Sequence, residues 1–335
     1  MYGWLAKPCW MRFHHQDCRK MSIPNDMKIW LEMEFKGHVR FDEPMSKHTS
    51  FRIGGPADVL VFPATKRELA VLITKAADNG VPWIVIGGGT NLLVKDGGIR
   101  GIVISTQKQK AVMEAATINE QITHIRTSAG TKLNAICRLA CQKGLRGMNF
   151  AIGIPGTVGG AIAMNAGTAD GAMQDVLYSV EYIDTDGFLK KAEKEDFLFS
   201  YRHFVLKGTD DFGSSGMPVI VEAVFEMVSG DPEILEQEAK IAFEKRSSSQ
   251  PSGVGNAGCF FKNPSGQEPA GRLIDLAGLK GYGIGGAFVS EKHANYIVNS
   301  GTATADDVLS LSHVIQEKVF RMFQVKLEPE VRIVG

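Results

Sequence analysis

Two glycine-rich segments constrain this chain more than any other feature. The first, Gly87-Gly88-Gly89-Thr90-Asn91, directly follows the apolar run Trp83–Ile86, which predicts a buried strand. Glycines have no Cβ, so their backbone N–H groups can approach a ligand closely, and a nest of such amides suits a pyrophosphate. The spacing matches neither the G-x-G-x-x-G dinucleotide fingerprint nor the G-x-x-x-x-G-K-[ST] phosphate loop. A plain turn that closes a strand would use the same glycines, so this segment alone does not decide between the two.

The second segment, Gly153–Asn165, consists largely of glycine, alanine and other small residues. Its backbone could lie flat against an extended ligand, although tight packing between two elements would need the same residues. Two such segments favour one shared, two-part ligand, and FAD fits this better than a mononucleotide does. The expected FAD contacts are Ile86, Gly87, Gly88, Gly89, Thr90, Asn91 and Leu92 in the first segment, and Gly153, Ile154, Pro155, Gly156, Thr157, Gly159, Gly160, Ala161 and Asn165 in the second.

Composition places the chain among ordinary enzyme-sized proteins. Its 335 residues are enough for two or three domains. Lys plus Arg and Asp plus Glu both number 37, so there is no basic excess to indicate nucleic-acid binding. No apolar run reaches the roughly 20 residues of a membrane-spanning helix. We therefore expect neither a nucleic-acid partner nor a membrane, and we make no prediction of protein partners.

The cysteines and the N-terminus favour a cytoplasmic protein. Five cysteines spread through a long chain are typical of a reducing compartment rather than of a disulfide framework. Residues 1–38 lack both a helical period and the apolar core of a signal peptide, so we expect a mobile extension there. Cys9, His14, His15 and Cys18 lie within it, but their spacing fits no standard zinc finger, and we expect no metal.

From Val59 onward, strand and helix patterns alternate. A capping box, Thr65-Lys66-Arg67-Glu68, predicts a helix that ends at Asn79-Gly80, and Asp231-Pro232-Glu233 predicts a helix to about Arg246. Further helices are predicted over Lys132–Gln142, Ala270–Ala277 and Ala305–Phe323, and strands over Val59–Phe62, Gly101–Ser105, His124–Ser128, Val180–Asp184, Val219–Val228, Asn295–Val298 and within Pro329–Val334. Cys137 and Cys141, four residues apart on one of these helices, are expected to be buried.

These segments carry a family resemblance. Ile86–Leu93 followed by Gly153–Asn165 resembles the FAD-binding fold of the vanillyl-alcohol-oxidase type. Three further motifs, Ser200-Tyr201-Arg202, the run from Gly255 to Pro264 and the run from Leu327 to Arg332, look like those of the UDP-N-acetylenolpyruvoylglucosamine reductase family of peptidoglycan synthesis. The resemblance covers about Met45 to the C-terminus.

The fold that this resemblance implies is α+β. It has a two-lobed FAD-binding domain of the vanillyl-alcohol-oxidase (PCMH) type and a C-terminal α+β substrate domain. We expect an N-terminal extension over residues 1–38, FAD-binding lobe 1 over 39–110, lobe 2 over 111–230, a substrate-binding domain over 231–323, and a C-terminal strand, 324–335, that returns to lobe 1.

The resemblance also implies a reaction in two halves. NADPH reduces FAD, and the reduced flavin delivers hydride to the enolpyruvyl methylene of UDP-N-acetylglucosamine enolpyruvate, giving UDP-N-acetylmuramate. Such chemistry needs a positive group, a second hydrogen-bonding acid and a proton donor. By their places in the motifs these are Arg202, Glu330 and Cys259, respectively.

Each of these three residues also has a simpler interpretation. Arg202 read alone would be a surface or ion-pair residue, and Glu330 would be a terminal charge paired with Arg332, with Glu328 as its competitor. Cys259 departs from the family pattern, which has serine as the proton donor. A thiol is still largely protonated at neutral pH but releases its proton more readily than an alcohol. The simple alternative is a buried free cysteine.

We expect four substrate contacts, at Tyr201, Arg246, Lys262 and Asn263. Lys262 and Asn263 resemble the family's substrate-contacting pair. Arg246 would contact the diphosphate, although a solvated helix end explains it equally well. Two rival functions share parts of this pattern. Another FAD oxidoreductase of the same fold would keep the glycine segments but need not carry the three catalytic residues. A catalytically silent UDP-sugar sensor would keep the binding residues and tolerate the loss of the proton donor.

Overall fold

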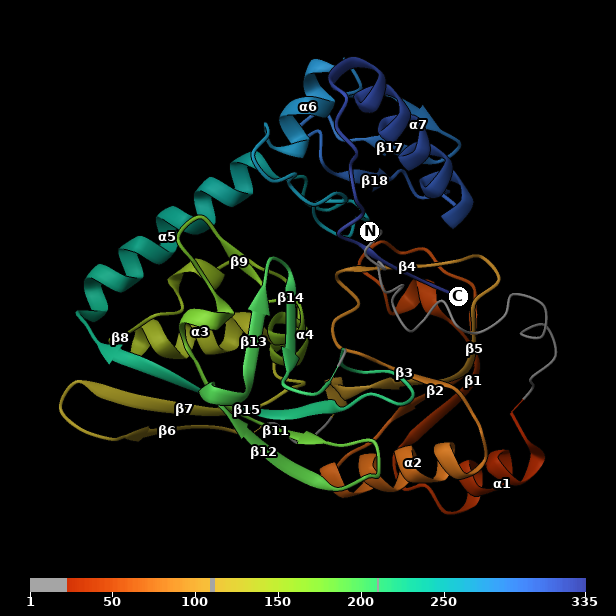
Figure 1. Ribbon diagram of the computed structural model, residues 1–335, viewed down its shortest axis with the longest axis vertical. Coiled ribbons are helices and arrows are strands. Elements are labelled where there is room, and N and C mark those ends of the chain that lie inside the picture. The colour runs from red at the N-terminus through yellow and green to blue at the C-terminus, as the bar shows by residue number, and fades with distance from the viewer. Residues whose placement is uncertain (1–22, 109–111, 210) are drawn as a thin grey trace, which may run out of the picture.

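The computed structural model describes residues 23–108, 112–209 and 211–335, which form three neighbouring parts (Figure 1). Lobe 1 is built on a four-stranded sheet in the order β1-β2-β5-β3. Its strands are β1 (His38–Pro44), β2 (Pro56–Phe62), β3 (Trp83–Ile86) and β5 (Ile99–Ser105). The pair β1 and β2 is antiparallel, whereas β5 is parallel to both of its neighbours, β2 and β3.

Two helices cover one face of the lobe 1 sheet. They are α1 (Asn25–Met33) and α2 (Lys66–Asp78). The predicted cap of α2 is confirmed: Thr65 accepts a hydrogen bond from the Glu68 amide at 3.1 Å. The Glu68 carboxylate in turn accepts from the Ala64 amide at 2.7 Å, one residue earlier than in a standard capping box. The other face of the sheet packs against the short strand β4 (Leu92–Val94).

The N-terminal part of the chain differs from its expectation. We expected residues 1–38 to be a mobile extension, but α1 lies within the described range, and its Met27, Trp30 and Leu31 are buried against α2 and the sheet. Residues 23–38 therefore belong to lobe 1. The helical spacing of Met27, Trp30 and Leu31 is present in the sequence, but it is too short to predict a helix by itself. Cys9, His14, His15 and Cys18 lie outside the described residues.

Lobe 2 holds a larger antiparallel sheet in the order β12-β11-β15-β7-β6, with β8 also on β15. These strands are β6 (Met113–Thr117), β7 (Ile122–Ser128), β8 (Leu145–Arg146), β11 (Leu177–Ile183), β12 (Leu189–Glu193) and β15 (Val219–Ser229). One face carries the helices α3 (Leu133–Gln142) and α4 (Val158–Ala163) and the hairpin of β13 (Phe197–Ser200) and β14 (His203–Leu206) (Figure 1). A small hairpin joins β9 (Gly167–Thr168) to β10 (Gly171–Ala172). As expected, Cys137 and Cys141 on α3 are buried.

The two lobes are joined by an ion cluster. Lys66, at the start of α2 in lobe 1, lies 2.6 Å from a Glu181 oxygen and 2.9 Å from a Glu222 oxygen in lobe 2. The Glu222 side chain is only 4% exposed and also faces Arg126 at 3.6 Å. A carboxylate this deeply buried needs both cations as partners, so the cluster fixes how the lobes meet.

The C-terminal domain, which we expect to bind the substrate and call the substrate domain below, packs α6 (Ala270–Leu276) and α7 (Ala305–Phe323) on a three-stranded sheet. Its strands are β16 (Gly283–Ile284), β17 (Ala287–Val289) and β18 (Ile297–Asn299). A long helix, α5 (Pro232–Ser249), crosses from lobe 2 to this domain (Figure 1). It extends three residues beyond the predicted end, and Asp231 caps its first turn as the sequence predicts. Single 3₁₀ turns lie at Met45–Lys47, Thr106–Lys108, Asn149–Ala151, Met173–Asp175 and Lys194–Asp196.

The substrate domain is anchored to lobe 1 rather than loosely tethered. Its apolar core includes Phe51 and Leu93 of lobe 1. The Asp96 carboxylate, also from lobe 1, accepts hydrogen bonds from the first two amides of α7, Ala305 at 2.9 Å and Asp306 at 3.0 Å. The last strand, β19 (Arg332–Val334), then pairs in parallel with β4, so the chain ends in lobe 1.

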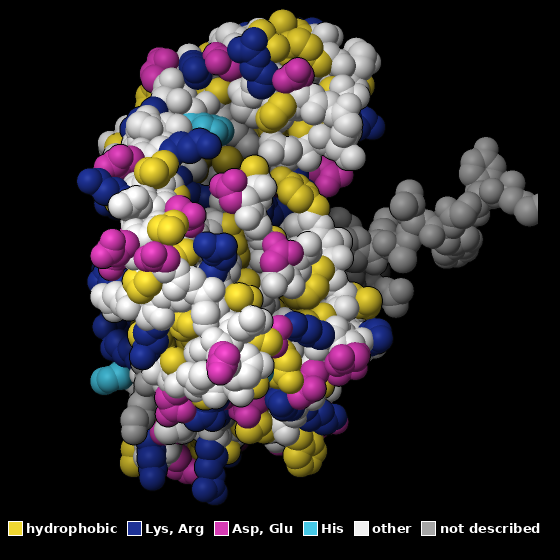
Figure 2. All heavy atoms as spheres, turned by 90° about the vertical axis from the view of Figure 1, so that its left-hand side faces the viewer, with side chains coloured by type: hydrophobic (Ala, Val, Ile, Leu, Met, Phe, Trp, Pro, Cys, Tyr) yellow, Lys and Arg dark blue, Asp and Glu magenta, His cyan; other side chains and the backbone are white. Residues whose placement is uncertain are grey.

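The surface matches the balanced charge of the sequence. Figure 2 shows basic and acidic side chains interspersed over the face that it displays. None of the helices in the described parts of the chain is long and apolar enough to span a membrane. The cytoplasmic location expected from the cysteine content stays a prediction.

We predict that Asp96→Ala lowers the free energy of unfolding by about 1–2 kcal/mol, because two amides at the positive end of α7 lose their charged acceptor. Urea denaturation of the purified protein measures this change. Glu32→Ala is the control, since Glu32 is an exposed helical carboxylate without an ion pair in the described part of the chain. Equal effects of the two substitutions would contradict the capping role.

Candidate active site

The two glycine-rich segments lie against each other, as one shared ligand requires. The Thr90 hydroxyl donates a hydrogen bond to the Pro155 carbonyl at 3.2 Å. A Cβ on Gly88 would lie 3.1 Å from the Gly156 Cα, and a Cβ on Gly89, whose φ is +62°, would collide with the His48 carbonyl. Side chains are therefore excluded from this contact, and the bare backbone of both segments forms one surface.

The second segment is not extended throughout. Its first part is a loop, but Val158–Ala163 forms the short helix α4, whose Gly159 amide bonds to the Ala129 carbonyl at 2.8 Å. Thr157, just before this helix, has a buried hydroxyl oxygen with no partner among the described residues. A Cβ on Gly87 would collide with that same oxygen. An unpaired buried hydroxyl beside a side-chain-free surface fits the phosphate part of a bound FAD.

The expected FAD contacts occupy different environments. Ile86, Leu92 and Ala161 are buried in the cores of their lobes, so only their backbone can meet a ligand. Of the other expected contacts, Gly88, Thr90, Pro155 and Gly156 lie where the two segments meet, and Gly87 faces Thr157. Gly89, Gly153 and Ile154 lie in the loops, whereas Gly159 and Gly160 belong to α4.

Two expected FAD contacts have their side chains engaged within the protein instead. The Asn91 amide donates to the Glu330 carbonyl at 3.1 Å. The buried Asn165 amide donates to Gln174 at 2.9 Å and to the Ser200 carbonyl at 3.2 Å. Each asparagine thus connects a glycine-rich segment to a segment that carries a candidate catalytic residue.

The hairpin of β13 and β14 presents Arg202. Ser200 pairs with His203, which leaves Tyr201 and Arg202 as a two-residue loop. Arg202 has a φ of +58°, a value that costs free energy in a residue other than glycine and is common at functional sites. Its guanidinium donates from Nη1 to the Gly167 carbonyl at 3.1 Å. The loop therefore fixes both the backbone and the side chain of Arg202.

Arg202 and Glu330 form an ion pair in a half-buried setting. Arg202 Nε lies 2.9 Å from Glu330 Oε1, with side chains 23% and 15% exposed. The N–H does not point well at the oxygen, so the contact is electrostatic rather than an aligned hydrogen bond. Burial raises the pKa of Glu330 above its ordinary value, and the charge of Arg202 only partly opposes this.

These contacts contradict the simpler interpretation of Glu330, whereas Arg202 does form an ion pair, as its simpler interpretation also predicts. Glu330 does not pair with Arg332, whose guanidinium instead approaches Asp211 at 4.0 Å. Glu328, the competitor of Glu330, is 76% exposed and lies 3.6 Å from Lys262. The structure therefore places Glu330, and not Glu328, in the interior of the site.

Cys259 lies beside this ion pair in a half-buried position. Burial, and secondly the negative charge of Glu330, raises the pKa of the Cys259 thiol to about 11. The cations Arg202 and Arg246 act in the opposite direction. The thiol is therefore fully protonated at neutral pH, and its protonation is controlled by the residues that surround it.

Sequence reasoning missed Tyr296. Its side chain is only 6% exposed, and its hydroxyl interacts with the Cys259 thiol. Burial raises the pKa of Tyr296, so it is neutral and can donate a hydrogen bond to sulfur. The sequence predicts a core residue for a tyrosine inside a strand, and no motif in the sequence links Tyr296 to Cys259.

The four expected substrate contacts lie near the candidate catalytic residues Arg202, Glu330 and Cys259. Tyr201, whose ring faces Arg202 at 5.1 Å, reaches across so that its hydroxyl lies 3.4 Å from the Asn263 amide. The Asn263 side chain accepts from the Ala270 amide at the start of α6. Lys262 is partly exposed, and Arg246 on α5 lies against Gly153, where a Cβ would come within 3.0 Å of it. One site thus draws residues from both lobes and the substrate domain.

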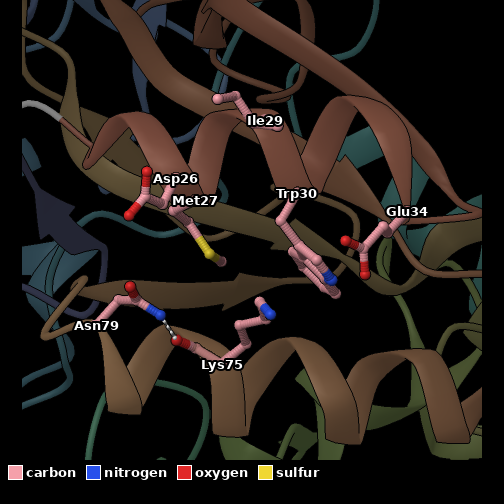
Figure 3. A pocket seen from close by; sticks show the side chains of 7 residues that line it. All are labelled: Asp26, Met27, Ile29, Trp30, Glu34, Lys75 and Asn79. Carbon is pink, nitrogen blue, oxygen red and sulfur yellow. Dashed lines mark hydrogen bonds between the residues drawn. The ribbon is translucent and has the colours of Figure 1, made fainter.

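A separate cavity of about 270 Å³ lies between α1 and α2 (Figure 3). In Figure 3, Met27 and Trp30 point from α1 toward α2, and the Lys75 ammonium lies 5.1 Å from the Trp30 ring. None of its lining residues belongs to the site around Cys259. Within residues 23–108, 112–209 and 211–335 there is no cluster of three His, Cys, Asp or Glu side chains suited to a metal.

Comparison with known proteins identifies both halves of the chain. A family model described as an FAD-binding domain matches residues 57–193, and one described as the C-terminal domain of UDP-N-acetylenolpyruvoylglucosamine reductase matches residues 250–334. The reductase of Desulfosudis oleivorans is 48% identical over 91% of this chain and 97% of its own length. That of Heliobacterium modesticaldum is 42% identical over 90% of this chain and 92% of its own. The crystal structure of the reductase from Thermus caldophilus superposes with a TM-score of 0.72 at 32% identity, covering 90% of this chain and 99% of that one.

We predict opposite effects of two substitutions on the pKa of Cys259. Glu330→Gln removes a negative charge and lowers this pKa, whereas Arg202→Met removes a positive charge and raises it. The midpoint of the pH-dependent alkylation of Cys259 by iodoacetamide measures the shift, and mass spectrometry of its peptide separates it from the other cysteines. A one-unit shift changes the alkylation rate below the midpoint about tenfold. Shifts of the same sign in both variants would contradict the electrostatic coupling.

Proposed function

The chain belongs to the UDP-N-acetylenolpyruvoylglucosamine reductase family, and from this premise we propose how its residues perform the reaction. As a member it is an FAD-dependent oxidoreductase of peptidoglycan precursor synthesis. We propose that the hydride donor is NADPH and that the substrate is UDP-N-acetylglucosamine enolpyruvate, which is converted to UDP-N-acetylmuramate. The observation that carries this proposal is the Arg202–Glu330 ion pair beside a protonated Cys259, at the edge of the glycine-rich surface.

FAD fits the surface formed by the two glycine-rich segments. The loop residues from Gly87 to Thr90 and from Gly153 to Thr157 would hold its pyrophosphate with backbone amides and the unpaired Thr157 hydroxyl. When bound, the flavin supplies a hydride, obtained from NADPH in our proposal, to the methylene carbon of the enolpyruvyl group. Asn91 and Asn165 act indirectly, by holding the segments that carry Glu330 and Arg202 against this surface.

Arg202 and Glu330 stabilise the negative charge that develops on the substrate. The guanidinium can hold the substrate carboxylate, and it offsets the negative charge that spreads into this group as hydride adds. A carboxylate bound to Arg202 competes with Glu330 for the same cation. Since burial raises the pKa of Glu330, losing that cation favours its protonated form, which can donate a hydrogen bond to the substrate oxygen.

Cys259 supplies the proton. In this step the S–H bond breaks, a C–H bond forms at the carbon next to the reduced methylene, and the sulfur is left as a thiolate. Arg202, Tyr296 and Arg246 each lower the pKa of Cys259 and therefore stabilise that thiolate. Family membership and the joint presence of the three catalytic residues favour this function over another oxidoreductase of the fold and over a silent sensor.

The two half-reactions test the proposal directly. In a stopped-flow instrument, NADPH should bleach the visible flavin absorbance of the purified protein. UDP-N-acetylglucosamine enolpyruvate, mixed with the bleached protein without oxygen, should restore it. If UDP-N-acetylglucosamine, which lacks the enolpyruvyl group, also restores the flavin absorbance, the restoration is an artefact. If the enolpyruvyl compound does not restore the absorbance, the proposed function is wrong.

Substitutions at Cys259 separate the proton donor from the hydride donor. Cys259→Ala should leave bleaching by NADPH near the wild-type rate but slow reoxidation by about 10²–10⁴-fold, the usual contribution of a general acid. Cys259→Ser should stay active because it retains a proton on a side chain of similar size. The proton-donor role is wrong if Cys259→Ala slows both half-reactions equally.

A further inference from the structure

A tight turn presents one asparagine to the back of the segment that carries Cys259. The turn runs from Ser290 to Tyr296 and is closed by the Ser290 amide, which donates to the Tyr296 carbonyl at 2.8 Å. Inside it, the Tyr296 amide bonds to the His293 carbonyl at 2.9 Å, and the Asn295 amide bonds to His293 Nδ1 at 3.2 Å. Asn295 is therefore held rigidly, and it is only 3% exposed.

Asn295 makes three hydrogen bonds to the two residues that follow Cys259. Its carbonyl accepts from the Phe260 amide at 2.7 Å, its side-chain oxygen accepts from the Phe261 amide at 2.9 Å, and its side-chain nitrogen donates to the Phe261 carbonyl at 2.8 Å. Asn295 alone thus satisfies the backbone hydrogen-bonding groups on this edge of the segment, as a neighbouring β-strand would.

The opposite edge of the same segment carries the other catalytic group. The Glu330 amide donates to the Phe260 carbonyl at 2.8 Å, and Phe261 bridges to Pro329. On the preceding side, Cys259 follows Gly258, whose φ is +80° and at which a Cβ would meet no neighbour. The Gly258 amide donates to the Asn256 side-chain oxygen at 3.0 Å, so the segment is also held before Cys259. After Cys259 it is held by Asn295 on one edge and by the Glu330 segment on the other.

We propose that Asn295 is a positioning residue, which aims the Cys259 thiol at the reacting carbon and keeps it in register with Glu330. This inference rests on the proposed function of Cys259 as proton donor. An amide suits the position best, because its separate oxygen and nitrogen match the one donor and the one acceptor that the Phe261 backbone presents. An aspartate would accept from the amide but would face the Phe261 carbonyl with a charge, and an alanine would leave both groups buried and unpaired.

Asn295→Asp and Asn295→Ala test this inference through the two half-reactions. We expect bleaching by NADPH within about threefold of the wild-type rate. Reoxidation by UDP-N-acetylglucosamine enolpyruvate should slow by about 10–10²-fold, since a small misplacement of a reacting group has effects of this size. Asn295→Ser, which keeps a short donor and acceptor, is the milder variant and should fall between wild type and alanine.

A second readout does not depend on the substrate. The midpoint of Cys259 alkylation against pH should shift in the Asn295 variants, because the thiol moves relative to Arg202, Glu330 and Tyr296. Asn299→Asp is the matched control. Asn299 is also buried, at 7% exposure, and its side-chain nitrogen bonds to the Phe51 carbonyl at 3.1 Å. It contacts the run that leads into Cys259 through its backbone amide, which donates to the Gly255 carbonyl at 2.8 Å, and aspartate keeps that bond. The control should lower the melting temperature without changing the ratio of the two half-reactions or the alkylation midpoint.

Several outcomes would overturn the inference. One is a wild-type rate of reoxidation in all three Asn295 variants, and another is an equal slowing of both half-reactions. A third is an Asn299→Asp variant whose half-reaction ratio changes as much as that of Asn295→Asp. If the wild-type protein itself fails to reoxidise, the proposed function falls, and the alkylation midpoints alone then decide whether Asn295 positions Cys259.

Discussion

The active site depends on hydrogen bonds that Asn91 makes to the end of the chain. Its side chain donates to the Glu330 carbonyl at 3.1 Å, and its own carbonyl accepts from the Arg332 amide at 3.0 Å. Asn91 lies two residues after the last glycine of the turn, so these bonds connect the glycine-rich surface to the segment that carries Glu330, the proposed catalytic glutamate. The same segment then bonds to Phe260, next to Cys259. Segments far apart in the sequence are thereby joined at one point.

The proposed catalytic residues, Arg202, Glu330 and Cys259, influence one another by charge. Arg202 and Glu330 are close enough for each to affect the other, and both act on Cys259 with opposite sign. Because these three side chains are half-buried, water screens the electrostatic interactions between them only partly. The cysteine at position 259, where the family resemblance leads us to expect a serine, is therefore best understood from its surroundings. Burial keeps the thiol protonated, and nearby donors and cations would stabilise the thiolate that the proposed proton transfer leaves.

Local patterns in the sequence predicted the elements well, and contacts between distant residues were the part that they could not predict. The helix Ala305–Phe323 and the strand Trp83–Ile86 have the bounds that their periodicity predicts. The pairing of Glu330 with Arg202, rather than with its near neighbour Arg332, depends on how the final segment returns to the site. Asn295 and Tyr296 had no signal, because their roles arise from a turn that meets a segment over thirty residues away in sequence. The helix α1 was missed because its apolar face is short and its burial depends on α2.

The helix α5 has a consequence for how the chain can vary. Only Leu235 among its 18 residues is buried, so most single substitutions along it should be tolerated as ordinary surface changes. Its length is another matter. The helix is about 27 Å long, and this length sets the separation between lobe 2 and the substrate domain. Arg246 lies near its C-terminal end, against Gly153. Inserting or deleting one residue would turn Arg246 by about 100° around the helix axis and away from the site. This helix should therefore accept many changes of residue but almost no change in the number of residues.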